Sequence, residues 1–216
     1  MTVYTLDKRF HTRVKRTPRT LEVAEMFGLG LDDREFVVYD AAQIEVNPGD
    51  VVYITGESGS GKSIALRELA KQMQAEGLQV ANLDTVKLNY NLPVIDQLGN
   101  NMKEASDFLT RTGVNDAYLF LRTPDQLSDG QLYRLKLAKL IESGAQVWVA
   151  DEFCAVLDRD CAKAISGTLQ KMARQLGVTL MVATTHSDMV QDLCPNLTIV
   201  KRYREKVSVV RAEEPT

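Results

Sequence analysis

Short apolar runs alternate with segments of helical periodicity through most of the chain. Four apolar runs are typical of buried parallel strands, at residues 51–54, 78–83, 146–150 and 178–183. Apolar side chains recur at helical spacing in three segments between or beside them, at residues 64–76, 131–143 and 163–176. This alternation predicts an α/β fold with a mainly parallel sheet flanked by helices.

Two regions depart from this alternation. Residues 2–6 and 35–46 have β character, with a helix expected at 21–27 and a turn at 47–50. Residues 94–126 are mostly helical in pattern and polar. We therefore expect one domain over residues 1–216, with a small N-terminal β portion at 1–50 and a short helical lobe at about 90–130.

Charge is distributed unevenly, although the net charge is only −3. The first 20 residues hold six basic residues against one acidic residue, and residues 201–206 hold four against one. Basic ends favour an anionic partner such as nucleic acid, whereas the alternative is an ordinary solvated surface.

The cysteines and the apolar runs bear on the cellular compartment. The three cysteines, Cys154, Cys161 and Cys194, lack metal-ligand spacing and are typical of reduced, partly buried thiols. No apolar run approaches the roughly 18–20 residues of a membrane span, and the N-terminus is charged where a secretory signal is apolar. We expect a cytoplasmic protein without a membrane span of its own.

A glycine-rich segment fits the phosphate-binding pattern G-x-x-x-x-G-K-[ST] between a strand and a helix. Its residues are Gly56, Glu57, Ser58, Gly59, Ser60, Gly61, Lys62 and Ser63. Glycines let successive backbone N–H groups point at phosphate oxygens, and the next helix presents its positive end to them. In this chemistry Lys62 binds the β- and γ-phosphates and the Ser63 hydroxyl binds Mg²⁺. The segment predicts ATP and Mg²⁺ as cofactors.

Four later segments decide which kind of P-loop protein this sequence resembles. They are 127–131 (LSDGQ), 147–152 (VWVADE), 155–158 (AVLD) and 182–186 (VATTH). In order and spacing they resemble the signature, Walker B, D-loop and switch segments of the ABC-type ATPases, over roughly residues 35–200. Asp129 replaces the first glycine of that signature, Phe153 stands where transporters have proline, and Arg134 is placed as in the family.

The acidic and histidine residues after two strands have roles that chemistry suggests directly. Asp151 ends a buried strand and is expected to bind Mg²⁺, and Glu152 is expected to act as general base on the attacking water. His186 ends another strand and is expected to hydrogen-bond the γ-phosphate. The carboxyl ends of parallel strands meet at one edge of the sheet, where ligands bind. We expect Glu152, His186 and Lys62 to be the catalytic residues.

The resemblance also implies a second copy and a further ligand. Two subunits would stack head to tail as an ATP-dependent homodimer, each P-loop facing the partner's Ser128, Gly130 and Gln131, with the D-loop residue Asp158 nearby. Gln97 is the candidate glutamine-loop ligand of Mg²⁺, with Gln126 or a surface glutamine as alternatives. Tyr39 and Phe27 are both candidates for the aromatic residue that stacks on adenine. The alternative is that each is an ordinary packing residue.

The sequence predicts an ATPase, and two functions fit it. The leading hypothesis is a stand-alone ABC-type ATPase coupled to a soluble partner, either protein or nucleic acid, because the lobe is short and the N-terminal stretch basic. The alternative is the ATP-binding subunit of a membrane transporter, with a groove on residues 90–126 that receives a membrane protein. A P-loop kinase is less favoured because it leaves the later segments unexplained.

Overall fold

The computed structural model describes residues 2–212, and its central layer is a sheet in the order β4-β5-β6-β3-β7-β8. Neighbouring strands are parallel except for β8, which runs antiparallel to β7. The strands are β3 (Val51–Gly56), β4 (Val80–Asn82), β5 (Val147–Ala150), β6 (Thr179–Ala183), β7 (Leu197–Lys201) and β8 (Ser208–Arg211). The predicted α/β fold with a mainly parallel sheet is confirmed. The two strands after residue 196 were not among the predicted elements.

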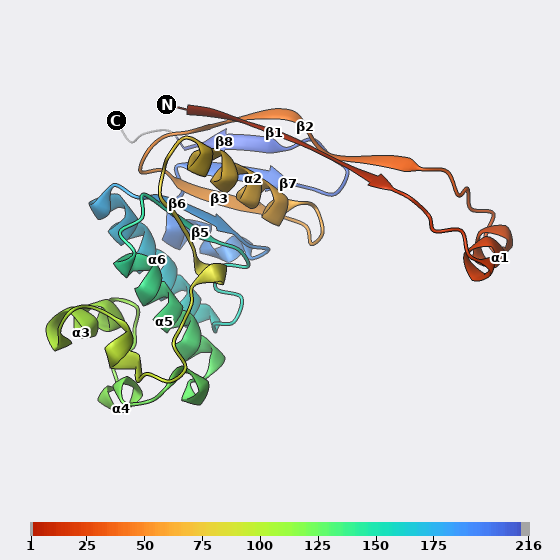
Figure 1. Cartoon of the computed structure of the whole chain (residues 1–216). Coiled ribbons are helices and arrows are strands. Elements are labelled where there is room, and N and C mark those ends of the chain that lie inside the picture. Colours follow the sequence, from red (N-terminus) through yellow and green to blue (C-terminus); the bar gives the residue numbers. More distant parts are fainter. Residues whose placement is uncertain (1, 213–216) are drawn as a thin grey trace.

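Helices cover both faces of this sheet (Figure 1). On one face α2 packs with the N-terminal hairpin over a core that includes Leu66, Leu69 and Ile54. On the other face a second core contains Trp148, Phe153 and side chains of three helices. The helices are α2 (Lys62–Ala75), α5 (Asp129–Glu142), α6 (Arg159–Leu176) and α7 (Val190–Leu193). Because both faces are covered, every residue of β5 and β6 is buried.

A helical lobe, which we define as residues 94–126, leans on α5 and has a small core of its own. That core joins lobe residues such as Leu98, Leu109 and Leu119 to Leu135 and Ala138 of α5. Its elements are η2 (Val94–Gln97), α3 (Met102–Arg111), α4 (Ala117–Phe120) and η3 (Pro124–Gln126). Turns separate these short helices, so the segment is less continuously helical than its pattern predicts.

An antiparallel hairpin of β1 (Thr2–Thr12) and β2 (Arg34–Val46) forms the N-terminal β portion. Its base is buried against α2 through Tyr4, Leu6 and Ile44. The register shifts twice between Leu6 and Arg9, the mark of a β-bulge, which bends and twists a hairpin. The first strand is therefore about twice as long as the run at residues 2–6 predicts.

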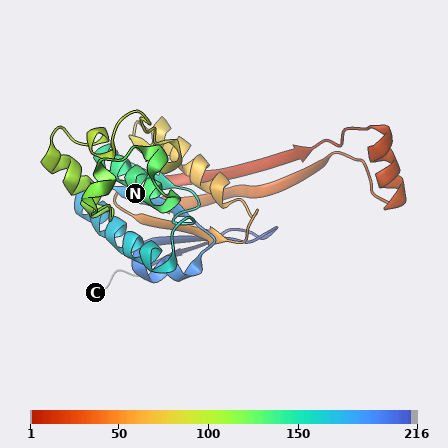
Figure 2. The same cartoon turned by 90° about the horizontal axis from the view of Figure 1, so that it is seen from below.

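Beyond its base the hairpin continues as an arm, which we define as residues 9–35, with α1 (Pro18–Met26) at its tip. Figures 1 and 2 show the arm projecting far from the rest of the molecule. The tip helix begins earlier than predicted because Thr17 caps it: Thr17 Oγ1 accepts from the Thr20 backbone N–H, and the Thr20 hydroxyl accepts from that of Thr17. Pro18 then occupies the first helical turn, where its missing N–H costs nothing.

The structure also describes the apolar character of the helices and the state of the cysteines. Within residues 2–212, no helix has both the length and the apolar character that a bilayer crossing requires. All three cysteines are free, and their exposure ranges from buried Cys154 through half-buried Cys161 to exposed Cys194.

Candidate functional site

The P-loop joins the end of β3 to the start of α2, and two of its glycines are required by the backbone. Gly56 has φ 137°, and a Cβ there would lie 1.9 Å from the Lys201 carbonyl oxygen. Gly61 has φ 108°, and a Cβ there would lie 2.5 Å from Cγ1 of Val38. The left-handed backbone and the close neighbours together exclude side chains at both positions. The loop is thus held tightly between β7 and the hairpin.

The Lys62 ammonium group is folded back over this loop. Its Nζ donates hydrogen bonds to the carbonyl oxygens of Gly56 at 3.0 Å and Glu57 at 2.7 Å. Burial lowers the pKa of Lys62, and the nearby Asp151 carboxylate opposes that shift. These bonds keep the cation at the mouth of the loop, where phosphate oxygens could replace the carbonyl acceptors.

Ser63 and Asp151 come together at the carboxyl edge of the sheet. The Ser63 Oγ donates a 2.9 Å hydrogen bond to Oδ1 of Asp151. The other carboxylate oxygen, Oδ2, lies 3.5 Å from Nη2 of Arg67, which is mostly exposed. A hydroxyl and a carboxylate side by side are oxygen donors of the kind that Mg²⁺ prefers. This donor set fits a magnesium ion.

The backbone at Glu152 is strained, and its side chain is exposed beside Asp151. Glu152 has φ 45°, a left-handed conformation that costs a non-glycine residue of order 1–3 kcal/mol. The next residue, Phe153, is fully buried and its N–H donates to the Ala183 carbonyl at 2.9 Å, which ties this turn to β6. The burial of Phe153 thus holds Glu152 outward, at the edge of the sheet.

His186 lies across the same hollow at the end of β6. Its N–H donates to Oγ1 of Thr184 at 3.2 Å, and its carbonyl accepts a short hydrogen bond from the Tyr53 hydroxyl. A hollow of about 280 Å³ is lined by the P-loop and by the ends of β5 and β6, including Ser58, Lys62, Ser63, Asp151, Glu152 and His186. The predicted catalytic residues therefore share one site.

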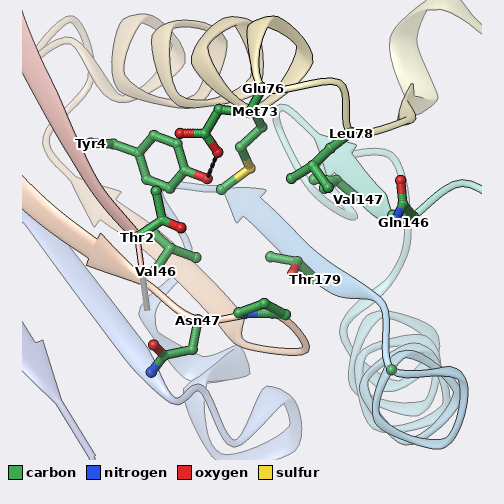
Figure 3. A pocket seen from close by; sticks show the side chains of 12 residues that line it. Thr2, Tyr4, Val46, Asn47, Met73, Glu76, Leu78, Gln146, Val147 and Thr179 are labelled. Carbon is green, nitrogen blue, oxygen red and sulfur yellow. Dashed lines mark hydrogen bonds between the residues drawn. The ribbon is translucent and has the colours of Figure 1, made fainter.

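A second hollow of about 300 Å³ lies at the opposite edge of the sheet (Figure 3). Apolar side chains such as Met73, Leu78 and Val147 line it, and Tyr4 donates a 2.9 Å hydrogen bond to Glu76 at its rim. Its lining contains no basic side chain, so it is not suited to a triphosphate. The hollow at the carboxyl edge, in contrast, is lined by Lys62.

A family model described as "ABC transporter" matches residues 39–155, which is more than half of the chain. The chain belongs to the ABC transporter family. The predicted identity as an ABC-type, P-loop ATPase is thereby confirmed at the level of the family.

The relatives of this ABC protein include methionine import ATP-binding proteins MetN. The one from Streptomyces coelicolor is 27% identical over 215 residues, which covers 79% of this chain and 60% of that protein. The one from Xylella fastidiosa is 24% identical over 207 residues, covering 81% of this chain and 62% of that protein. The chain thus spans about 60% of the length of these relatives.

Solved structures of ABC cassettes share the fold. The cassette MJ0796, described as a dimeric bacterial ABC transporter cassette, matches with a TM-score of 0.70 at 14% identity, over 98% of this chain and 100% of that one. Its dimeric post-hydrolysis state, bound to ADP and Pi, matches with a TM-score of 0.69 at 16% identity and the same coverage.

The signature residues of this ABC chain lie outside its own P-loop hollow. Ser128 is exposed and caps α5: its Oγ accepts from the Gln131 N–H at 3.3 Å, and Gln131 Oε1 accepts from the Ser128 N–H at 3.0 Å. Gly130 packs toward Leu157 of the D-loop segment, where a Cβ would meet Cδ2 at 3.4 Å. Asp158 caps α6 through a 2.9 Å bond from the Cys161 N–H, which lowers the pKa of Asp158. Signature and D-loop therefore form one surface.

The structure does not bring Gln97 to the other candidate magnesium ligands. Its side chain is nearly buried in the lobe, where Oε1 accepts from the Asn89 N–H at 3.0 Å and Nε2 donates to the Leu92 carbonyl at 3.3 Å. Gln97 also does not line the P-loop hollow. These bonds give it a structural role in the lobe, which corrects the expected metal ligand.

Asp84 is the residue that the sequence pattern missed at this site. It follows β4 in η1 (Leu83–Thr85), and its carboxylate accepts a hydrogen bond from the Asp151 backbone N–H. Burial and the Asp151 charge raise the pKa of Asp84, while Lys136 and Arg67 oppose the shift. The pairing of β4 with β5 could have suggested this neighbour, because the carboxyl ends of adjacent parallel strands lie together.

Neither expected adenine-stacking aromatic is available beside the loop. Tyr39 is buried, with its hydroxyl bonded to the Gly61 carbonyl at 3.1 Å, and Phe27 lies on the distant arm tip. Phe36 and Tyr203 instead form an aromatic pair with ring centroids 6.0 Å apart. The Tyr203 N–H donates to Oε2 of the P-loop residue Glu57 at 3.1 Å, which places this pair next to the loop.

Proposed function

We propose that this chain is the ATP-binding subunit of an ABC transporter and that it binds and hydrolyses MgATP at the carboxyl edge of its sheet. The hydrogen bond between Ser63 and Asp151 carries this proposal, because it joins the P-loop to the acidic end of β5 with the Lys62 ammonium beside them. The MetN relatives favour the transporter function over coupling to a soluble partner.

Each residue of the hollow has a defined task in hydrolysis. The backbone N–H groups of the P-loop and the Lys62 ammonium bind the β- and γ-phosphate oxygens. Ser63 and Asp151 would hold Mg²⁺, which when bound neutralises charge on those oxygens. The Glu152 carboxylate accepts a proton from the attacking water, and the His186 imidazole donates a hydrogen bond to the γ-phosphate.

The hollow is incomplete in a single copy. Ser128, Gly130 and Gln131 begin α5, whose positive end suits a phosphate anion, yet none of them lines the chain's own hollow. Two copies arranged head to tail would bring each signature to the other P-loop, with one isologous interface. ATP is then held between the copies, and its hydrolysis loosens them.

A membrane partner would dock on the lobe. Met102 on the lobe and Tyr90 and Leu92 just before it in the chain are large apolar side chains with exposed fractions of 63%, 53% and 39%. Exposed apolar side chains that gather on one surface are typical of protein interfaces. Neither relatives nor fold identify the transported substrate, so the proposal is confined to the ATP-binding subunit.

Three measurements test the proposal. Purified protein should release phosphate from ATP only with Mg²⁺ present, and the Glu152→Gln variant should dimerise with MgATP in sedimentation velocity. Affinity capture of Glu152→Gln with MgATP from detergent-solubilised membranes of the source cells should recover an integral membrane protein, and Lys62→Ala should recover less. ATPase activity together with capture of only non-membrane proteins would overturn the transporter assignment and leave the ATPase assignment standing.

A further inference from the structure

The arm extends past the nucleotide-binding edge of the molecule. The P-loop residue Gly61 packs on Val38 and Tyr39, midway along β2, and Tyr39 pairs with Lys8. From there the strands stay paired as far as Thr12 and Arg34, four or five residues further, or about 13–17 Å. The tip helix α1 lies beyond that pairing. A second protein molecule bound against the P-loop would therefore lie alongside the arm.

The tip presents apolar side chains to solvent. Leu21, Met26, Phe27 and Leu29 have exposed fractions of 47%, 73%, 70% and 58%. The tip is nonetheless ordered by its own hydrogen bonds, the Thr17 cap and a bond from the Leu29 N–H to the Ala24 carbonyl at 2.8 Å. A structured helix that exposes an apolar cluster is suited to docking on another protein surface.

The charges of the arm argue against nucleic acid as that surface. Arg9 pairs with Asp40 at 2.6 Å, and Arg13 pairs with Asp33 at 3.2 Å. Residues 13–33 carry four basic and four acidic residues, so the tip has no net positive charge. Phosphate binding requires a surplus of cations. Three exposed basic residues without an ion pair within residues 2–212 remain near the start of α1: Lys15, Arg16 and Arg19.

The lobe offers the matching surface. Tyr118 and Leu121, on and just after α4, have exposed fractions of 77% and 74%. Three exposed carboxylates and one exposed guanidinium stand close to them in the chain, so this surface carries a small negative surplus: Asp116, Asp125 and Asp129, with Arg122. Leu119 and Leu127 share the lobe core, so this surface adjoins the signature segment. Apolar and acidic groups here complement the apolar and basic groups of the tip.

The arm and the lobe stand at opposite ends of the molecule with the P-loop edge between them (Figure 1). A two-fold rotation can place the P-loop of one copy against the signature segment of the other. The same rotation brings the lobe of the second copy toward the arm of the first. In Figure 2 the arm tip and the lobe lie at the same level. A chain cannot make this contact with its own lobe, because the arm points away from it.

From these observations we infer that the arm is a clasp between copies: α1 of each chain docks on α4 and the adjoining turn of the second copy's lobe. The clasp rests on the head-to-tail dimer proposed above and adds two symmetric contacts at its periphery. It stabilises the closed dimer and lies beside each nucleotide without touching the reacting atoms. The contact is intermolecular, so its contribution appears in the dimer affinity and not in the affinity of a monomer for ATP.

The test uses the full chain carrying Glu152→Gln, with MgATP, in sedimentation equilibrium. Adding Met26→Glu and Phe27→Glu should raise the dimer dissociation constant by about tenfold or more, as expected for apolar anchors at an interface. Leu121→Glu on the lobe should do the same. The matched control is Leu176→Glu, another exposed apolar residue (57%) at the C-terminal end of α6, which should leave the dimer unchanged. Circular dichroism and monomer affinity for ATP show whether each variant is folded.

A photocrosslink locates the contact independently. Benzoylphenylalanine at position 27, in a mixture of ¹⁵N-labelled and unlabelled chains with MgATP, should crosslink to residues 116–125 of the other isotopic form. Native dimer affinity in the Met26→Glu/Phe27→Glu chain, or a crosslink within one chain or elsewhere on the second copy, would overturn the clasp. If the Glu152→Gln chain with an intact arm stays monomeric, the head-to-tail dimer itself is refuted, and that result is distinct from loss of the clasp alone.

Discussion

Ser63 donates a 2.9 Å hydrogen bond to Asp151, although 88 positions separate the two residues in the chain. The parallel strands β3 and β5 bring them together, because both residues follow the carboxyl end of a strand of the same sheet. The bond holds a hydroxyl and a carboxylate oxygen at one point before any cation arrives. It therefore marks the position that we propose for Mg²⁺.

Replacing this hydroxyl tests its assignment as a magnesium ligand. Ser63→Ala should lower the ATPase rate by about 10–100-fold at fixed Mg²⁺, with part of the loss recovered at high Mg²⁺, because one oxygen donor is removed. Ser63→Thr keeps the hydroxyl and is the matched control. A Mg²⁺ titration of phosphate release separates the two variants. An unchanged Mg²⁺ requirement in Ser63→Ala would remove Ser63 from the ligand set.

A near-isosteric substitution can distinguish the role of Glu152 from that of its neighbour Asp151. Glu152→Gln should lower turnover by about 10²–10⁴-fold while ATP affinity is retained, since the amide cannot accept the proton of the attacking water. Glu104→Gln, an exposed carboxylate on α3 that does not line the hollow, is a suitable control. Equilibrium binding and single-turnover hydrolysis measure the two quantities. A Glu152→Gln chain that hydrolyses ATP at the native rate would refute its role as general base.

Asp84 should act on the site through Asp151 and not by touching the nucleotide. Asp84→Ala removes the acceptor of the Asp151 N–H and should lower Mg²⁺-dependent ATPase activity by about 10–100-fold. Asp84→Asn keeps an oxygen acceptor and should lose much less. Asp107→Ala, on an exposed face of α3, controls for loss of an acidic side chain. Equal losses in Asp84→Ala and Asp84→Asn would mean that the charge, not the hydrogen bond, matters.

The aromatic pair beside the P-loop is the candidate platform for adenine. Tyr203→Ala should weaken ATP binding by about 5–150-fold, because base–aromatic stacking contributes roughly 1–3 kcal/mol. Tyr203→Phe keeps the ring and should bind nearly as well, and Tyr90→Ala, an exposed tyrosine near the lobe, should have no effect on affinity. Calorimetry with ATP and with inorganic triphosphate separates a base contact from a phosphate contact. Equal weakening for both ligands would exclude stacking.

The sequence predicted those parts of the molecule in which local pattern and global fold agree. Four apolar runs at residues 51–54, 78–83, 146–150 and 178–183 each contain or overlap a parallel strand, and the glycine pattern at Gly56 correctly placed the strand-to-helix turn. Burial on both faces makes such strands continuously apolar, so their signal is strong.

The missed features depend on contacts that residue type and spacing do not reveal. Gln97 has the right residue type, yet its amide bonds the backbone of Asn89 and Leu92, just before the lobe. Asp84 has no motif of its own and becomes part of the site only because β4 pairs with β5. The arm is missed only in part: the tip helix and β2 overlap predicted elements, but the extension of β1 over residues 7–12 was not predicted, because its polar, exposed positions lack the alternation of a half-buried sheet.

Gly56 offers a test of how closely the sheet determines the P-loop. Gly56→Ala should lower the free energy of unfolding by about 2–4 kcal/mol, since it combines a positive φ with a Cβ only 1.9 Å from the Lys201 carbonyl. Gly59→Ala is the matched control: its φ is +71°, but no atom lies within 4 Å of the added carbon. That substitution should cost only about 1–2 kcal/mol, the backbone contribution alone. Urea unfolding measures the free energy of unfolding of both variants. Equal losses would show that β7 shifts at Lys201 to accept the added carbon, and that the backbone conformation, not close packing, requires glycine at position 56.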